Sequence, residues 1–103
     1  MTRGTTPTYT LTLDDDTIDL GLAANVYATF AQSGGKRITK TGDDLTVDGH
    51  TVSVYLTQEE TLSLLAAKRA DIQLNWVYAD GSRACSEIVN IAVKPNLLPE
   101  VLT

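Results

Sequence analysis

Turn-forming residues interrupt this chain at short intervals, and their spacing constrains the fold more than any other feature. The stretches between them are rich in Val, Ile, Thr and Tyr, whose branched or aromatic side chains fit the pleated surface of a sheet. Short strands separated by tight turns are typical of β-sandwiches and small barrels. The turn residues lie at positions 14–16, 33–35, 42–44, 48–49 and 80–81.

The runs between these turns are predicted strands, and a chain of 103 residues can bury one core but not two. We therefore predict an immunoglobulin-like antiparallel β-sandwich of about seven to eight strands with one short helix. The sandwich spans residues 8–94, after a flexible N-terminus at 1–7 and before an extended C-terminal arm at 95–103. The predicted strands are 8–13, 17–20, 25–32, 36–41, 45–48, 51–56, 71–79 and 83–94.

The strand at 51–56 shows how one face of the sheet is assigned to the core. Its apolar residues alternate with Thr51, Ser53 and Tyr55, and a period of two places alternate side chains on opposite faces. The strand before the turn at 48–49 continues the apolar face. The predicted core residues are Val52, Val54, Leu56, Leu45 and Val47.

A single helix is predicted at 57–67. Thr57 and Glu60 have the spacing of a capping box, in which each side chain accepts a hydrogen bond from the other residue's backbone amide. Glu59 suits the positive end of the helix dipole, and Lys68 and Arg69 suit the negative end. We interpret the acidic pair, Glu59 and Glu60, as capping groups rather than catalytic groups. We expect an apolar stripe to hold the helix on the sheet. That stripe consists of Leu62, Leu65 and Ala66.

The last hairpin allows two registers. A two-residue turn at 80–81 would bury Glu87 beside Leu74, whereas a three-residue loop with a left-handed Gly81 avoids that cost. We predict the second register, and a further bulge or change of sheet near Asn90, where the apolar alternation changes phase. The predicted pairs are Trp76 with Ala84, Leu74 with Ser86, and Ile72 with Ile88.

Residues that could perform catalysis or bind a metal are scarce. Cys85 and His50 are the only cysteine and histidine, so a catalytic triad has one possible pairing and a structural zinc site lacks ligands. We expect Cys85 to be a half-buried thiol in a strand and His50 to meet solvent in a turn. No glycine-rich phosphate loop is present. We therefore expect no enzymatic activity and no cofactor.

The net charge of −5 opposes binding to nucleic acid, which needs clustered basic residues. Lys36, Arg37 and Lys40 come closest to a cluster, but we expect them on a solvated strand. No stretch approaches the roughly 18 apolar residues of a membrane-spanning helix. Neither nucleic acid nor a membrane is therefore an expected partner.

Asp14, Asp15 and Asp16 form the best candidate metal site, because calcium takes carboxylate ligands from loops. Asp43 and Asp44 could join them from another loop. The ligand spacing of an EF-hand is absent, so we expect a solvated turn that hinders edge pairing and keep calcium as the weaker alternative.

The arm at 95–103 carries four apolar residues between and after its prolines. Proline disfavours both a helix and a central strand, so an extended conformation is expected. Exposed apolar residues on an arm must cover another surface, either on the same domain or on a neighbouring subunit. These candidate interface residues are Leu97, Leu98, Val101 and Leu102.

Several stretches of the chain are distinctive: VYATFAQSG at 26–34, VSV at 52–54, LTQEET at 56–61, IQL at 72–74 and DG at 80–81. Together they resemble a family of small structural proteins encoded among the tail-region genes of phages and prophages of Gram-positive bacteria. The chain also resembles β-sandwich domains that phages use as connectors and adhesin scaffolds. This resemblance implies a virion component of the tail or baseplate, made in the host cytoplasm, that contacts other tail proteins or its own copies.

Two other function classes remain open. A receptor- or carbohydrate-binding module would stack exposed aromatic rings on sugars, and Tyr27 and Tyr55 are its leading candidates. An enzyme would require a partner chain to complete its site. The remaining aromatic candidates for glycan binding are Tyr9, Tyr78 and Trp76, of which Trp76 is assigned to the core.

Overall fold

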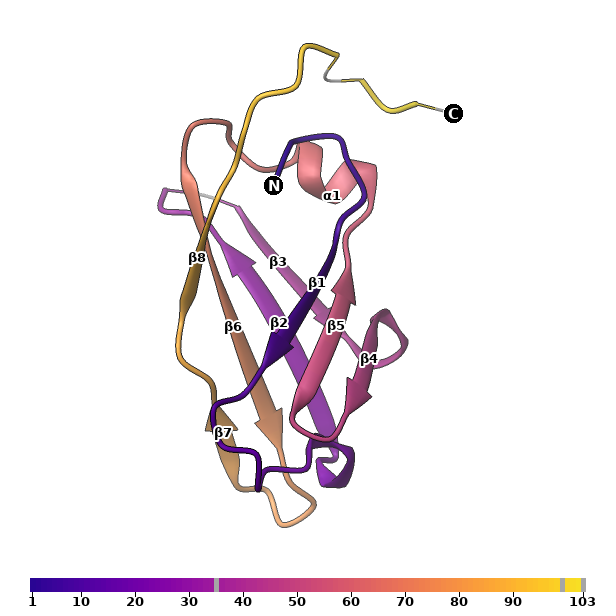
Figure 1. The fold of residues 1–103 in the computed structure, drawn as a ribbon, viewed down its shortest axis with the longest axis vertical. Helices are drawn as coiled ribbons and strands as arrows, with labels where there is room; N and C mark the ends of the chain where they lie inside the picture. Colours follow the sequence, from indigo (N-terminus) through magenta and orange to yellow (C-terminus); the bar gives the residue numbers. More distant parts are fainter. Residues whose placement is uncertain (35, 99, 103) are drawn as a thin grey trace.

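The computed structural model describes residues 1–34, 36–98 and 100–102, and it consists of two antiparallel sheets packed face to face (Figure 1). The predicted mainly β sandwich with one short helix is confirmed. The three-stranded sheet has the order β1 (Thr8–Thr12), β5 (Thr51–Tyr55), β4 (Leu45–Asp48). The five-stranded sheet has β3 (Arg37–Thr41), β2 (Asn25–Ala31) and β6 (Arg69–Val77), with β7 (Arg83–Cys85) and β8 (Val89–Ala92) both pairing with β6.

This strand order is that of an immunoglobulin sandwich. In that nomenclature β1, β5 and β4 are strands B, E and D, while β3, β2, β6 and β7–β8 are strands C′, C, F and G. The position of strand A, beside the outer edge of β1, is unfilled within the described part of the chain. Thr2 instead forms a parallel bridge with Lys94, just beyond β8.

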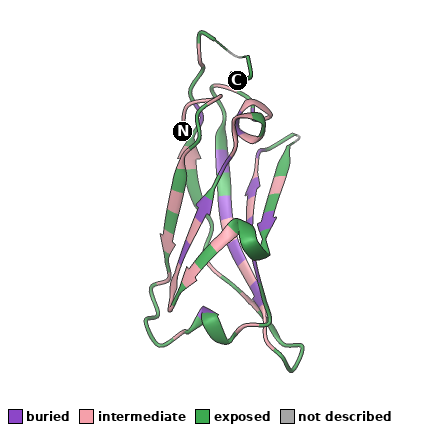
Figure 2. Ribbon diagram, turned by 90° about the vertical axis from the view of Figure 1, so that its right-hand side faces the viewer, coloured by how far each residue is buried: buried purple, intermediate pink, exposed green. Residues whose placement is uncertain are grey.

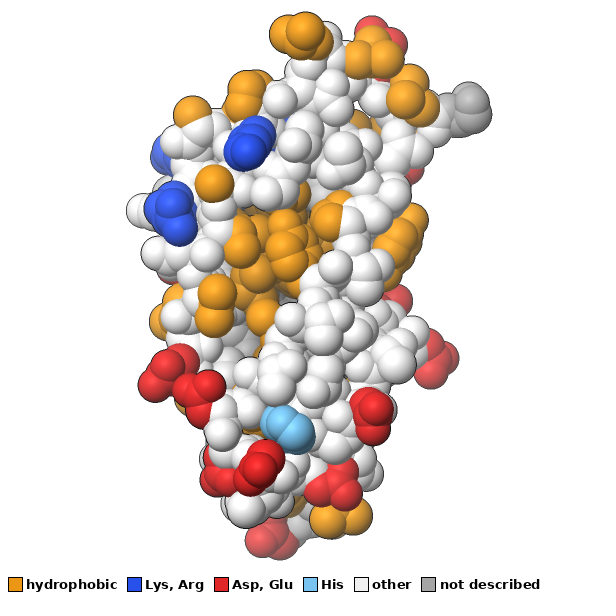
Figure 3. All heavy atoms as spheres, viewed as in Figure 1, with side chains coloured by type: hydrophobic (Ala, Val, Ile, Leu, Met, Phe, Trp, Pro, Cys, Tyr) orange, Lys and Arg blue, Asp and Glu red, His pale blue; other side chains and the backbone are white. Residues whose placement is uncertain are grey.

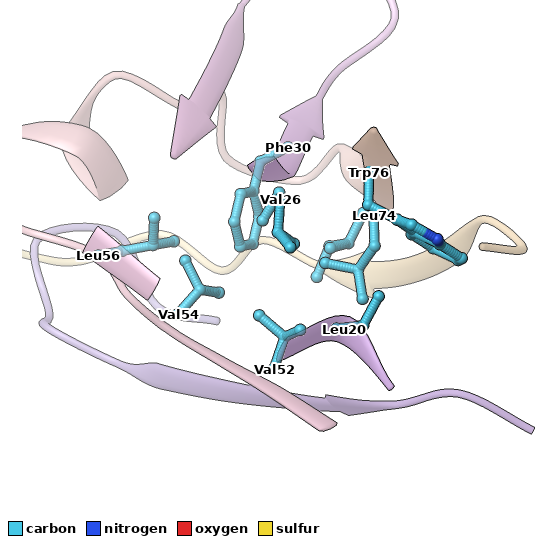
Figure 4. Packing of buried hydrophobic residues seen from close by; sticks show 10 residues of the cluster. Leu20, Val26, Phe30, Val52, Val54, Leu56, Leu74 and Trp76 are labelled. Carbon is cyan, nitrogen blue, oxygen red and sulfur yellow. The ribbon is translucent and has the colours of Figure 1, made fainter. Parts of the chain in front are cut away.

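The core lies between the two sheets and is built from the inward residues of each strand (Figure 2). The predicted inward face of β5 is confirmed, since Val52 and Val54 are fully buried and Leu45 and Val47 pack against them half-buried. Figure 4 shows the side chains of Val52 and Val54 pointing toward those of the opposite sheet. The buried residues facing them include Val26, Ala28 and Phe30 of β2 and Ile72, Leu74 and Trp76 of β6.

The capping box at the start of α1 (Gln58–Leu62) is confirmed, but the helix is shorter than the predicted 57–67. The Ser63 hydroxyl donates to the Glu60 carbonyl at 2.6 Å, and Ala67 adopts a left-handed conformation with φ of 63°. Such side-chain bonds to the backbone end helices. Lys68 and Arg69 therefore do not lie at the helix end.

The apolar stripe predicted for the helix is also wrong. Leu65 is 46% exposed, whereas Leu64 is fully buried against Ala70 and Val93 in a second, smaller core cluster. The chain leaves the helical path at Ser63, which turns the neighbouring leucine inward. Packing at the end of the sandwich, rather than helical periodicity, decides which leucine is buried.

The three-residue loop between β6 and β7 is confirmed. The Tyr78 amide donates to the Ser82 carbonyl at 2.9 Å, Gly81 has φ of 88°, and Trp76 lies opposite Ala84. A glycine favours this loop because L side chains rarely adopt a positive φ.

The predicted single strand at 83–94 is wrong, because it divides into β7 and β8. Ile72 pairs with Val89 rather than Ile88, so the register slips by one residue between Cys85 and Val89 instead of near Asn90. The Ser86 hydroxyl accepts a hydrogen bond from the Leu74 amide at 2.9 Å. A side chain thus takes the place of a strand partner, which is a common cause of a bulge.

The strand predicted at 17–20 is replaced by a turn and a 3₁₀ helix, η1 (Leu20–Leu22). Asp15 accepts hydrogen bonds from the amide and hydroxyl of Thr17, and Asp19 accepts one from the Gly21 amide. Aspartates that bond to nearby backbone in this way favour turns over strands. A second 3₁₀ helix, η2 (Gly42–Asp44), joins β3 to β4.

The N-terminal residues, expected to be flexible, form backbone hydrogen bonds with the chain beyond β8. The Lys94 amide donates to the Met1 carbonyl at 2.7 Å, and the Arg3 amide donates to the Lys94 carbonyl at 3.0 Å. The Gly4 amide donates to the buried hydroxyl of Thr61 at 2.9 Å. This segment therefore joins β8 to α1 at one end of the sandwich.

Candidate interaction surface at an open flank

The sandwich has two flanks, where the edges of the two sheets lie opposite each other. One flank is closed by a direct connection between the sheets, and the other is open. On one flank, η2 carries the chain directly from β3 to β4; we call it the closed flank. On the other, β1 lies opposite β7 and β8, and a cleft of about 350 Å³ opens between them. We call these the open flank and the open cleft. Figure 3 shows apolar side chains in this hollow, with acidic groups below it and basic groups above.

The floor of the open cleft is part of the hydrophobic core. Ile72, Leu74 and Trp76 line it, and each is at most 2% exposed. The Trp76 indole N–H donates to the Tyr78 hydroxyl at 3.0 Å, so its polar atom has a partner. Leu11, Leu13 and Ile18 line the β1 side, and Val89 lines the β8 side.

One edge of β1 has unpaired backbone groups. The Leu13 amide donates to the His50 carbonyl, and the Leu56 amide donates to the Pro7 carbonyl. Because bonding directions alternate along an antiparallel pair, the N–H and C=O groups of Thr8, Thr10 and Thr12 point away from β5. No backbone bond to that edge of β1 occurs within residues 1–34, 36–98 and 100–102.

The edge strands of the closed flank carry charges, whereas β1 (TYTLT) and β8 (VNIA) of the open flank carry none. The one charged residue of β7, Arg83, lines the depression around Tyr27 instead of the open cleft. Lys40 of β3, predicted to be solvated, instead points inward and is only 8% exposed. Its ammonium group contacts the Glu60 carboxylate at 2.7 Å. Inward-pointing charges on edge strands are one of the features by which proteins protect an edge from pairing with another chain.

Glu60 joins the helix cap to this ion pair. Its Oε1 atom accepts hydrogen bonds from the Thr57 amide at 2.9 Å and from Lys40 Nζ. Partial burial opposes ionisation of the carboxyl, but the hydrogen bonds from Lys40 and Thr57 together outweigh burial and lower the pKa of Glu60. The hydrogen bond from the Thr57 amide to Glu60 supports the predicted capping role of Glu60.

The predicted aspartates lie at the lower end of the open cleft. Asp14 and Asp15 line it together with Glu87 of the opposite edge. The hydrogen bonds from the Thr17 hydroxyl and amide lower the pKa of Asp15. Asp15 thus bonds to its own turn, and the described residues contain no group of three or more possible ligands that could hold a metal ion.

Cys85 also lines the open cleft, and it is exposed rather than half-buried as predicted. The strand ends at this residue, so no neighbouring strand covers it. His50 is half-buried in the turn between β4 and β5, where its carbonyl accepts the bond from Leu13.

The two leading glycan candidates lie on opposite faces of the sandwich. Tyr27 projects from the outer face of β2 into a shallow depression of about 340 Å³, which also contains Arg83 and Asn75. Tyr55 projects from the outer face of β5 and is 49% exposed. One ligand therefore cannot contact both rings. Tyr9 is partly buried against Phe30, with ring centroids 5.9 Å apart, and burial raises its pKa.

The arm leaves the sandwich beside α1 with most of its apolar surface uncovered. Leu97 is fully exposed, at 105% of its reference area, and the other three candidate interface residues are about half exposed. Polar contacts hold the arm in place: Asn96 donates to the Arg3 carbonyl, and the Gln58 side chain exchanges two hydrogen bonds with the Leu102 backbone. The half-exposed residues are Leu98, Val101 and Leu102.

Sequence reasoning found the apolar arm but missed the open cleft. The absence of charge from 8–12 and 89–92 was a visible signal, but only the fold places these two segments on the same flank. No helix in the described part of the chain is both long and apolar enough to span a membrane. Comparisons with protein-family models, curated proteins and solved structures found no match to this chain.

Proposed function

We propose that this chain is a non-enzymatic structural component of a phage or prophage virion, in the tail or baseplate, acting through contacts with other tail proteins and its own copies. The observation that carries the assembly role is the open flank, where two uncharged edge strands border a cleft with a core floor. The sequence resemblance supplies the virion context.

The physical case is that an open edge gives affinity with little interface area. An added strand would bond to the free N–H and C=O groups of β1 and place alternate side chains against the partly exposed Leu11, Leu13 and Val89 of the cleft. Soluble monomers usually protect such edges, as the closed flank does with Lys40. An edge left open is therefore a suitable contact site for assembly.

The test is whether the chain is part of the particle. Prophage particles are induced from the source strain, purified on a density gradient and analysed by mass spectrometry. We expect the chain to co-purify with the tail proteins, and a deletion strain to yield particles with absent or defective tails. A chain that occurs in the lysate but is missing from intact particles would overturn the proposal.

A second candidate function, glycan or receptor binding, is supported by the depression around Tyr27. It combines an aromatic ring with the guanidinium of Arg83, which donates to Asn75 at 2.9 Å, and such combinations suit sugar hydroxyls and ring faces. Glycan-array binding that is lost in Tyr27→Ala and retained in Tyr55→Ala would support this function. Binding that both variants retain would exclude this depression as the site.

A further inference from the structure

We propose that the open cleft receives the arm of a second copy of this chain, added as a strand antiparallel to β1. The inference rests on the proposed function and deepens it, because it names the partner and the direction of assembly. Each copy would then donate one arm and accept another.

The arm and the cleft have complementary apolar surfaces. In an extended chain Leu97 and Val101 project to the same side, because side chains alternate with a period of two. Glu100 projects to the opposite side, so the arm can face the cleft with leucine and valine while its carboxylate stays in solvent. Fully exposed Leu97 would pack against the partly exposed apolar residues that line the cleft, namely Leu11 and Leu13 on the β1 side and Val89 on the β8 side.

Charge determines the direction of the added strand. The lower end of the cleft is acidic, with Asp14, Asp15 and Glu87. Basic residues lie beyond the upper end, outside the lining of the cleft: Arg69, which pairs with Ala92 at the end of β8, and Lys94, which follows that strand. In the arm the order is reversed: Lys94 precedes it and Glu100 lies within it. The best match places Lys94 of the second copy at the acidic end and its Glu100 at the basic end.

The spacing of these charges agrees with that match. Lys94 and Glu100 are six positions apart, which corresponds to about 20 Å in an extended strand. The path from Glu87 to Lys94 along β8 covers a similar length, about 20 Å. Since β1 runs toward Asp14, an arm that starts at the acidic end runs antiparallel to β1, as strand A does beside strand B.

The same charges disfavour insertion of the arm into the cleft of its own domain. The arm leaves its domain at the end of the sandwich where the N-terminus and α1 lie (Figure 1), and basic groups lie above the cleft at that end (Figure 3). A return into its own cleft would run from the basic to the acidic end and carry Glu100 toward Asp14, Asp15 and Glu87. Like charges at close range are unfavourable, whereas the arm of a second copy avoids them.

This contact is heterologous, because the arm and the cleft are different surfaces of each copy. The arm leaves one end of the long axis, and the acidic end of the cleft lies toward the other (Figures 1 and 3). Copies would therefore join head to tail, and such contacts give closed rings or open fibres rather than two-fold dimers.

Sedimentation of the full chain over a concentration series tests the proposal. We expect oligomers larger than dimers for the wild type. Leu97→Asp removes the arm's anchor and should weaken association roughly tenfold or more. Leu97 is fully exposed in the monomer, so this change leaves folding intact. Leu22→Asp is the matched control, since Leu22 is 75% exposed but lies in η1, outside the cleft lining.

A complementation experiment distinguishes head-to-tail assembly from any symmetric contact. Glu87→Lys impairs the cleft by repelling Lys94 of the incoming copy, while its own arm stays intact. Leu97→Asp impairs the arm and leaves the cleft intact. Each variant alone should be monomeric, and a mixture should form a 1:1 dimer that grows no further.

Three outcomes would overturn the inference: a wild type that stays monomeric at its highest soluble concentration, association that Leu97→Asp leaves unchanged, or a mixture that forms no dimer. The virion test remains independent of this result. If the chain is monomeric but present in purified particles, the arm exchange is wrong and the proposed function still holds. If the chain associates as expected but is absent from particles, the proposed function is wrong and the arm exchange still holds.

Discussion

The two flanks of this sandwich differ in whether their strand edges are protected. On the closed flank, η2 connects the sheets, and β3 turns the ammonium group of Lys40 inward onto the Glu60 carboxylate. On the open flank, the uncharged strands β1 and β8 border a cleft whose floor is the core itself. One domain of 103 residues thus protects one pair of edges and leaves the other pair available.

This difference between the flanks indicates where an assembly contact can form. A strand added beside β3 would lie next to the charged residues Arg37 and Lys40, whereas a strand added beside β1 would meet free backbone groups and apolar side chains. An inward-pointing charge distinguishes the two flanks, because β3 has Lys40 while β1 and β8 have no charged residue. The predictions below test that distinction, from the largest expected effect to the smallest.

The floor of the open cleft should contribute fully to folding although the cleft itself is open. Trp76→Ala is expected to lower the free energy of unfolding by about 3–5 kcal/mol, because it removes a large buried side chain. Urea denaturation followed by circular dichroism measures this change. Leu22→Ala, at an exposed apolar position, should stay within about 0.5 kcal/mol of the wild type. A loss below about 1 kcal/mol for Trp76→Ala would mean that the open flank is not part of the cooperative core.

The closed flank should depend on its ion pair. Glu60→Ala leaves the nearly buried Lys40 ammonium unpaired and removes one side of the capping box, with an expected loss of about 2–3 kcal/mol. The double variant Lys40→Met/Glu60→Gln removes both charges and should recover most of that loss, because no unpaired charge remains. Equal losses in the single and double variants would contradict the role of the ion pair.

The same ion pair predicts how stability depends on pH. The pKa of Glu60 is below its ordinary value of 4.5 in the folded chain, so the folded state favours the ionised carboxylate. Its contribution to stability is complete above about pH 4.5 and disappears as the pH falls through the folded pKa. Melting temperatures from pH 7 to pH 3 should therefore fall more steeply for the wild type than for Lys40→Met/Glu60→Gln.

Asp15 and Asp80 also have lowered pKa values, because they accept hydrogen bonds from Thr17 and Ser82. Their contributions have the same sign and occur in the same acidic range. Both residues are present in the wild type and in the double variant, so the difference between the two melting curves isolates Glu60. Parallel curves would show that Glu60 makes no pH-dependent contribution.

The smallest effect on stability is expected at the exposed edge of β1. Thr10→Lys gives that edge the charge it lacks, at a position where the hydroxyl makes a single exposed contact with Ser53 at 3.1 Å. The free energy of unfolding should change by less than about 0.5 kcal/mol. Self-association measured by sedimentation should nevertheless fall. Unchanged association would mean that β1 is not the accepting edge.

Local chemistry explains which parts of the fold were predictable. The capping box joins Thr57 to Glu60 over a single turn, and the loop at 79–81 depends on one left-handed glycine. The alternation of Val52 and Val54 with polar neighbours fixes the inward face of β5. In each case the deciding groups lie within a few residues of one another, so the sequence pattern contains the whole interaction.

The two wrong strand predictions, at 17–20 and at 83–94, depend on side chains that bond to backbone across or beside a strand. Asp15 and Asp19 turn 17–20 away from a strand, and Ser86 bonds to the Leu74 amide and divides the final strand. Of the candidate site, the sequence predicted the apolar arm and the Asp14–Asp16 turn. It did not predict that the turn borders a cleft, because that requires the positions of both sheet edges.

The sequence by itself determined the strand-rich domain, its inward faces, the capped helix and the apolar arm, because periodicity and short-range hydrogen bonds encode them. The tertiary structure alone decided that Lys40 is buried against Glu60, that Leu64 rather than Leu65 packs inward, and that β1 and β8 border one cleft. These features join residues far apart in the chain, and their positions follow only from how the two sheets pack.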